Sequence, residues 1–163
     1  MAEDIKDISL SNKKSFRIDG DNSRIIYIDT ADMNIAVRIE ETYPEIRKLA
    51  VEAVERLAKS STETPEATEE DEDGEVKFST LSVTLKDIDA QIREKLNYIF
   101  ASDVADICEP TGNMYDLVGG EFRFEHIIDV LTRLYANNIA EEYKKMQARV
   151  KKHTAKYTGR RKK

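Results

Sequence analysis

The sequence has few of the residues from which metal and redox centres are built. Its 163 residues include one cysteine, Cys108, two histidines and no tryptophan. A single cysteine excludes an internal disulfide and fits a reducing compartment. Two histidines and one cysteine do not make a zinc site. The composition therefore predicts no metal centre, and no motif in the chain calls for a cofactor.

Extended apolar runs are missing as well. No stretch is apolar enough to span a membrane. Residues 1–10 alternate charged residues with isolated apolar ones and lack the hydrophobic core of a signal peptide. With 40% hydrophobic and 36% charged residues, the chain should bury a modest core under a large solvated surface. We expect a soluble, cytoplasmic protein that makes no contact with membranes.

The charges are segregated along the chain, although the formal net charge is only -6. Residues 63–75 carry eight acids and no base, whereas residues 144–163 carry ten bases and no acid. Acid self-repulsion and the lack of apolar residues predict a disordered insertion over 60–76. The expected organisation is a flexible N-terminus over 1–12, one mostly helical domain over 13–150 that contains the insertion, and a basic tail over 151–163.

A β-hairpin is predicted near the N-terminus. Two β-prone runs, 15–19 and 24–29, flank the turn formers of Asp19–Ser23. Phe16 and Ile18 would share one face of the first strand. An isolated hairpin is only marginally stable, so we expect this one to pack on a helix. Residues 35–39 fit either a third strand or an opening helical turn.

Apolar residues at helical spacing predict three main helices, at about 43–59, 85–100 and 121–140. Thr42 and Glu45 have the spacing of a capping box, with Pro44 in the first turn. Thr84 and Asp87 are placed to cap the second helix. A short helix should restart at Ser102–Asp103. The predicted fold class is α+β, mainly α, with the hairpin packed on a three- to four-helix core.

The stretch from Gly119 to Val150 organises the rest of the chain. Its apolar residues recur at spacings of three and four, so that they lie on one side of a helix. Read as one helix, it would be roughly 45 Å long, more than a small domain can bury. We expect the first half to be core and the second half to project. The core stripe comprises Phe124, Ile127, Ile128, Leu131, Leu134 and Tyr135, and Ile139, Tyr143 and Met146 extend it more thinly.

Catalytic constellations are poor. His126 stands in the helical stripe without a cysteine or carboxylate partner at a recognisable spacing, and His153 stands among lysines. Cys108 is interpreted as a buried small hydrophobic residue. Asp103, Asp106 and Glu109 are spaced by three, which is typical of a solvated carboxylate face. These patterns predict a protein that is not an enzyme and has no catalytic residues.

Two further motifs favour structural readings over ligand sites. Gly119-Gly120 lacks the patterns of phosphate-binding loops and is interpreted as a tight turn that sets the angle of the following helix. Asp71-Glu72-Asp73-Gly74 lacks the alternating ligands and terminal glutamate of an EF-hand. We therefore expect neither a nucleotide nor a calcium site.

The basic tail is the strongest single feature. Its lysines and arginines fit three partners: nucleic-acid phosphates, an acidic protein, or the acidic insertion of a neighbouring copy. Protein contact is favoured, because the folded body is itself acidic and would repel DNA. The candidate partner-binding residues are Tyr143, Met146, Lys151, Lys152, Tyr157, Arg160 and Arg161.

The order of elements, together with three stretches, resembles a known family. The stretches are Ile92-Arg93 through Phe100–Val104, the turn Leu117–Gly120 before the long helix, and the ending Lys156–Arg161. They are similar to the short tail-assembly chaperones of long-tailed, siphovirus-like phages and prophages. The resemblance covers most of the chain from about Ser15, whereas the acidic insertion departs from it.

The resemblance implies a non-enzymatic role in virion assembly. Such chaperones coat the tape-measure protein, keep its helices soluble, help recruit tail-tube subunits and leave before the tail is complete. This chain would be the short form of a pair that ribosomal frameshifting produces, would self-associate, and would be absent from the mature particle. The rival hypotheses are a nucleic-acid-binding accessory protein that acts through the tail, and a structural tail or head-completion component.

Overall fold

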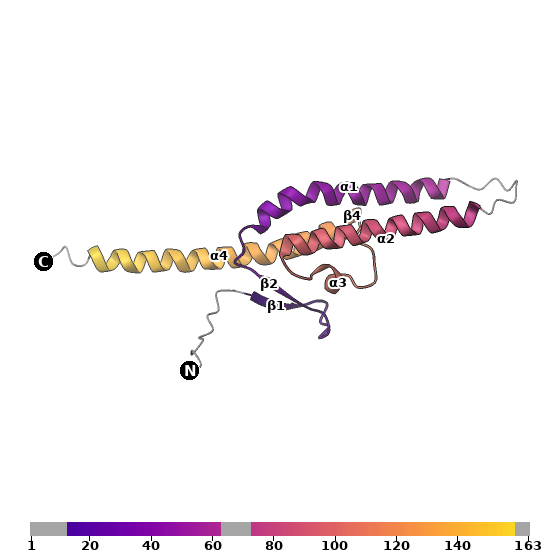
Figure 1. Cartoon of the computed structure of the whole chain (residues 1–163). Coiled ribbons are helices and arrows are strands. Elements are labelled where there is room, and N and C mark those ends of the chain that lie inside the picture. Colours follow the sequence, from indigo (N-terminus) through magenta and orange to yellow (C-terminus); the bar gives the residue numbers. More distant parts are fainter. Residues whose placement is uncertain (1–12, 63–72, 159–163) are drawn as a thin grey trace, which may run out of the picture.

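The computed structural model describes residues 13–62 and 73–158 (Figure 1). It is mainly helical with a small β component, which confirms the predicted fold class. Helices α1 (Ile35–Thr62) and α2 (Asp73–Phe100) run antiparallel, and helix α4 (Arg123–Thr158) lies along them before it leaves the body. The short helix α3 (Ala105–Cys108) lies in the connection between α2 and α4.

The N-terminal hairpin pairs β1 (Lys13–Arg17) with β2 (Ile25–Asp29) in antiparallel register, with Phe16 opposite Ile26. The turn forms because Asp19 and Gly20 adopt positive φ angles of 52° and 72°, which aspartate and glycine tolerate well. Ile26 is fully buried in the same core as the helices. The predicted hairpin and its packing on the helical body are confirmed.

The core lies between α1, α2, α4 and the hairpin, and it follows the predicted stripes. Ile46 on α1, Ile92 and Leu96 on α2, and Phe124 on α4 are fully buried. Fully burying a side chain of this size stabilises the fold by about 1.5–3 kcal/mol. Phe100 stacks on Tyr135 with their ring centroids 6.2 Å apart, which ties the end of α2 to the middle of α4.

The capping-box prediction for α1 is wrong, because that helix begins at Ile35 and includes residues 35–39. Its first hydrogen bond runs from the Arg38 N–H to the Asn34 carbonyl, at 3.0 Å. Thr42 is buried within the helix, and Pro44 lies in its interior. Figure 1 shows the first turns of α1 inclined to the rest, as expected near an interior proline.

The predicted start of the second helix is also wrong. Helix α2 begins at Asp73, and the Thr84 hydroxyl donates to the Thr80 carbonyl one turn earlier, at 2.9 Å, instead of capping. Both long helices therefore enter the stretch 60–76 that was expected to be disordered. Residues 63–72, and with them most of the acidic insertion, lie outside the described residues.

A second hairpin, with two residues in each strand, precedes α4. The sequence did not predict it. Strand β3 (Leu117–Val118) pairs with β4 (Glu121–Phe122), and Gly119 and Gly120 form the turn between them. Their φ angles of 63° and 87° are left-handed, which explains a glycine pair here. The predicted tight turn is confirmed, and the long helix starts three residues after it.

Candidate partner-binding surface

The second half of α4 projects from the body as an arm, defined here as residues 139–158. None of its side chains is buried, and Asn138 is the last buried residue of the helix. Twenty helical residues extend about 30 Å, and Figure 1 shows this arm reaching away from the other helices. The prediction that the first half is core and the second half projects is confirmed. Residues 151–158, expected as tail, continue the helix.

One side of the arm carries an apolar stripe, which we call the arm stripe. It consists of Ile139, Tyr143, Met146, Val150 and Tyr157, whose exposed fractions range from 40% to 73%. The spacings are four, three, four and seven, and His153 stands in the gap before Tyr157. At about 100° per residue these six positions fall within an arc of roughly 80°. This is the narrow seam by which one helix packs against another.

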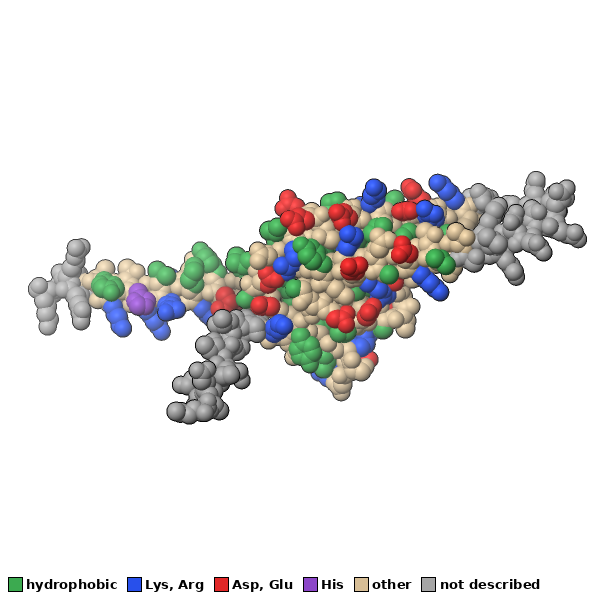
Figure 2. Space-filling model, in the orientation of Figure 1, with side chains coloured by type: hydrophobic (Ala, Val, Ile, Leu, Met, Phe, Trp, Pro, Cys, Tyr) green, Lys and Arg blue, Asp and Glu red, His purple; other side chains and the backbone are tan. Residues whose placement is uncertain are grey.

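Four bases of the arm lie on the opposite side of the helix: Lys144, Lys145, Lys151 and Lys152. Figure 2 shows lysine and arginine side chains along one edge of the arm and apolar side chains along the other. The same helical geometry places Glu142, Arg149 and Lys156 at one border of the arm stripe. The opposite border carries Ala140, Gln147 and Thr154, which are uncharged. Lys145 donates to Glu142 at 2.7 Å, and this bond lowers the pKa of the Glu142 carboxyl.

The root of the arm is fixed by Asn138. Its amide donates to the Thr30 carbonyl at 3.1 Å and accepts from the Lys14 ammonium at 2.6 Å. Thr30 and Asn138 are only 1% and 5% exposed. The direction in which α4 leaves the body is therefore set by the N-terminal hairpin and the turn that follows it.

The first turn of α4 is fixed by Glu125. One of its carboxylate oxygens accepts from the Phe122 N–H at 3.1 Å, ahead of the helix. The other accepts from the Tyr43 hydroxyl and from Arg47 at 2.6 Å, both on α1. The hydrogen bond to Glu125, together with burial, raises the pKa of Tyr43. Both ends of the buried half of α4 are thus held to other elements by polar contacts.

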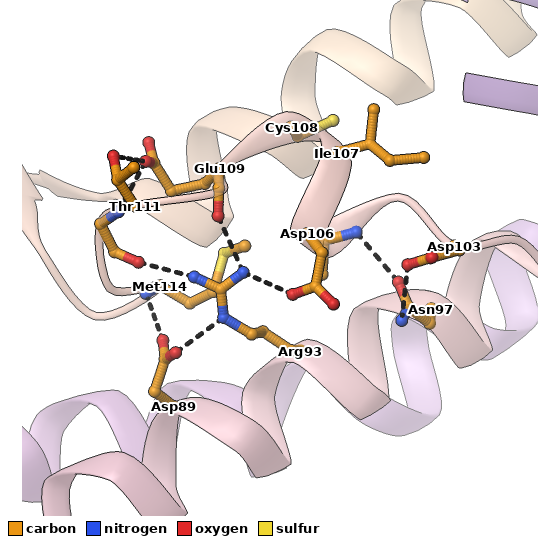
Figure 3. A network of polar contacts seen from close by, with 12 residues as sticks. Asp89, Arg93, Asn97, Asp103, Asp106, Ile107, Cys108, Glu109, Thr111 and Met114 are labelled. Carbon is orange, nitrogen blue, oxygen red and sulfur yellow. Dashed lines mark hydrogen bonds and ion pairs between the residues drawn. The ribbon is translucent and has the colours of Figure 1, made fainter. Parts of the chain in front are cut away.

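The connection between α2 and α4 is held by Arg93, as Figure 3 shows. Its guanidinium pairs with Asp89 at 2.7 Å and with Asp106 at 2.8 Å. It also donates to the carbonyls of Glu109 and Gly112, at 2.8 and 2.6 Å. Asp89 in turn accepts from the Met114 N–H at 2.7 Å, so the Arg93–Asp89 pair holds the part of the connection between residues 106 and 114.

The prediction of a solvated carboxylate face at Asp103, Asp106 and Glu109 is wrong for Glu109. Its side chain is 14% exposed, pairs with Arg123 at 2.6 Å and accepts from the Gly112 N–H at 2.8 Å. Burial acts to raise its pKa, but the Gly112 hydrogen bond and the Arg123 charge outweigh it and hold the pKa below its ordinary value. The short helix expected to restart at Ser102–Asp103 begins later, at Ala105. The Asn97 side chain accepts from the Val104 and Ala105 N–H groups, both at 2.9 Å.

The residues considered for chemistry are dispersed. Cys108 is half-buried against the core, and burial raises the pKa of its thiol to about 11, which keeps it protonated. His126 is exposed on α4 and His153 lies on the arm. Across residues 13–62 and 73–158, no three histidine, cysteine or acidic side chains are grouped so as to hold a metal ion. In the same part of the chain, no helix has the length and apolar character of a membrane span.

The predicted partner-binding residues fall on two sides of the arm. Tyr143, Met146 and Tyr157 belong to the arm stripe, whereas Lys151 and Lys152 lie on the basic side. Arg160 and Arg161 are outside the described residues.

Sequence reasoning missed Val150 and His153 as part of the same seam, and it treated Ile139 only as an extension of the core. The alternating four- and three-residue spacing from 139 to 157 was the signal for all three.

No family model, no curated protein and no solved structure matches this chain.

Proposed function

We propose that this protein is a non-enzymatic assembly chaperone that binds the tape-measure protein of a long-tailed phage or prophage. It would keep that helical client soluble and help recruit tail-tube subunits. The single observation that carries the proposal is the arm stripe: a seam of helix-packing spacing on the projecting half of α4, where no side chain is buried. Amphipathic helices are recognised by such seams through apolar residues at spacings of three and four.

The attachment of the arm supports this role. Asn138 and Glu125 fix α4 to the hairpin and to α1, so the seam is presented in a defined direction. A client helix that packs on Met146 and Val150 would bury side chains that are 52% and 57% exposed in the free chain. A long client would offer many such segments in succession, and each copy of this protein would cover one.

The test is co-expression with the proposed client, a tape-measure protein encoded in the same genome. We compare Met146→Asn, on the arm stripe, with Ala148→Asn, which adds the same side chain to the opposite side of the helix. The first should reduce the soluble fraction of the client, and the second should leave it unchanged. Equal solubility with both variants would contradict the proposal. Circular dichroism checks that both keep the helix content of the parent.

Two further observations address the rivals. The protein should be absent from purified mature particles, because a chaperone leaves before completion; its presence there would favour a structural component. Deleting Lys151–Lys163 should weaken assembly or client binding, and more so at low salt, since basic residues contribute through screened electrostatics.

A second candidate function, nucleic-acid binding, is favoured by the one-sided distribution of bases on the arm. If it held, binding of a fluorescent duplex or single strand would fall steeply with salt, because phosphate neutralisation releases counterions. Replacement of Lys151 and Lys152 by alanine would reduce the salt slope, and Met146→Asn would have no effect. Absence of binding at low salt removes this candidate.

A further inference from the structure

We propose that the arm stripe of the free protein is covered by the arm of a second copy in an antiparallel pair. The two-fold axis crosses the seam at the level of Ala148, whose own side chain lies on the opposite side of the helix. The occupant is thus this chain itself, and the pairing is argued from the order of residues along the stripe and from the charges beside it. The additional inference that a client displaces the second copy rests on the proposed function.

The stripe is symmetric about Ala148. Ile139 and Tyr157 lie nine residues before and after it, Tyr143 and His153 lie five, and Met146 and Val150 lie two. When two helices run in opposite directions, residues at equal distances from the axis face each other. In a single register, every stripe residue therefore meets a stripe residue of the other copy: Ile139 packs on Tyr157, Tyr143 on His153 and Met146 on Val150. In each layer one residue of the pair comes from each copy.

The charged border of the stripe favours the antiparallel direction. In that arrangement Glu142 of one copy lies near Lys156 of the other, and the same contact recurs on the far side of the axis. Arg149 meets its own counterpart at the axis, which is the one unfavourable contact. In a parallel pair this charged border would instead face the uncharged border of the other copy, with Ala140, Gln147 and Thr154, so Glu142 would gain no opposite charge. Opposite charges across a helix seam set partner orientation.

The body adds a steric argument in the same direction. Figure 1 shows α1, α2 and the hairpin gathered around the first half of α4, with the arm leaving on one side. Antiparallel arms put the two bodies at opposite ends of the seam. Parallel arms would instead bring both bodies together at the Ile139 end.

The seam is short for a permanent dimer. Five apolar residues from each copy bury less than the roughly 800 Å² per partner of a standard interface. We therefore expect dissociation in the micromolar range, which would leave the seam available to a client at higher local concentration.

Cross-linking determines the direction of pairing. In a Cys108→Ala background, one protein carries Ile139→Cys and another, of different mass, carries Tyr157→Cys. With a short bis-maleimide, the mixture should give a cross-linked heterodimer, while each protein alone should give almost none. Cross-linking of each protein with itself would show a parallel pair and overturn the proposal. So would the absence of any cross-link together with a monomer in sedimentation at several hundred micromolar.

A charge exchange tests the register independently. Glu142→Lys or Lys156→Glu alone should weaken the dimer about tenfold, since each creates two like-charge contacts. The double variant should recover most of the parental affinity, because the pairs are restored with reversed signs. Glu141→Lys, which makes the same charge change away from the seam, is the matched control and should have little effect. A double variant as weak as the sum of the singles would refute this register.

The outcomes separate this inference from the proposed function. A monomer that still keeps the client soluble would overturn the antiparallel pair and leave the chaperone role standing. A protein that forms the antiparallel dimer but does not change client solubility would support the pairing and overturn the chaperone role. If both hold, added client should convert the dimer into a one-to-one complex, which light scattering measures directly.

Discussion

Replacing Arg93 by methionine should destabilise the fold by about 3 kcal/mol. The side chains of Arg93 and Asp89 are each 15% exposed, so their pair is largely shielded from water. Removing one member of a buried pair costs about 3–5 kcal/mol, because the other charge is left without its partner. We take the lower end of this energy range for two reasons. Asp89 would still accept the hydrogen bond from the Met114 N–H, and Asp106 is 69% exposed, so water can solvate its charge. The carbonyls of Glu109 and Gly112 lose their donors as well.

The assay is urea unfolding, with Arg56→Met as the matched control. Arg56 pairs with Glu52 at the same four-residue spacing and a similar distance, 2.8 Å, but the two side chains are 48% and 43% exposed. An exposed pair of this kind contributes about 0.3–0.5 kcal/mol. With an m-value of about 2 kcal/mol per molar urea, Arg93→Met should lower the midpoint by about 1.5 M and Arg56→Met by about 0.2 M. Equal shifts of the urea midpoint for the two variants would show that the buried Arg93–Asp89 pair stabilises the fold no more than the exposed Arg56–Glu52 pair does.

Three further predictions concern single contacts. The pKa of Glu109 is held below its ordinary 4.5, so its contribution to stability is present above that value and is lost as the pH falls through the lower, folded-state pKa; Glu109→Gln should therefore flatten acid unfolding followed by circular dichroism. Asn138→Leu should cost about 2 kcal/mol in urea, because the buried Thr30 carbonyl loses its donor, and an unchanged midpoint would show that this contact does not anchor α4. Gly119 has a φ of 63° and no atom near an added Cβ, so Gly119→Val should cost at least about 1 kcal/mol more than Gly119→Asn in thermal unfolding, and equal melting temperatures would contradict the backbone argument.

The parts of the fold that the sequence predicts well are those with strong periodicity. Ile46 and Ala50, Ile88 and Ile92, and the buried half of α4 follow the spacing of three and four and are buried as expected. The N-terminal hairpin is likewise local, because its turn formers decide where the chain reverses. These signals depend on neighbours within a few residues, which a sequence displays directly.

The boundaries and the polar contacts follow from long-range contacts instead. Thr42 and Pro44 have the appearance of a helix start, but the helix begins earlier because Ile35 is buried in the core and Arg38 donates to the Ile99 carbonyl on α2. Glu109 is buried because Arg123 reaches it from the start of α4. Neither partner is within a helical turn of its contact, so no local pattern could have indicated them.

The arm stripe has no explanation within the fold of a single copy. Residues 139–158 bury no side chain, so their apolar character contributes nothing to the core. A helix that starts from an anchored body needs no new nucleus, and lysine, glutamate, alanine and glutamine would propagate it at least as well as Tyr143 or Val150. Exposed apolar side chains in an ordered seam instead reduce solubility. Their regular spacing on one side is the pattern by which a helix packs on another helix, and this is why both proposals, a second copy and a client, place a helix there.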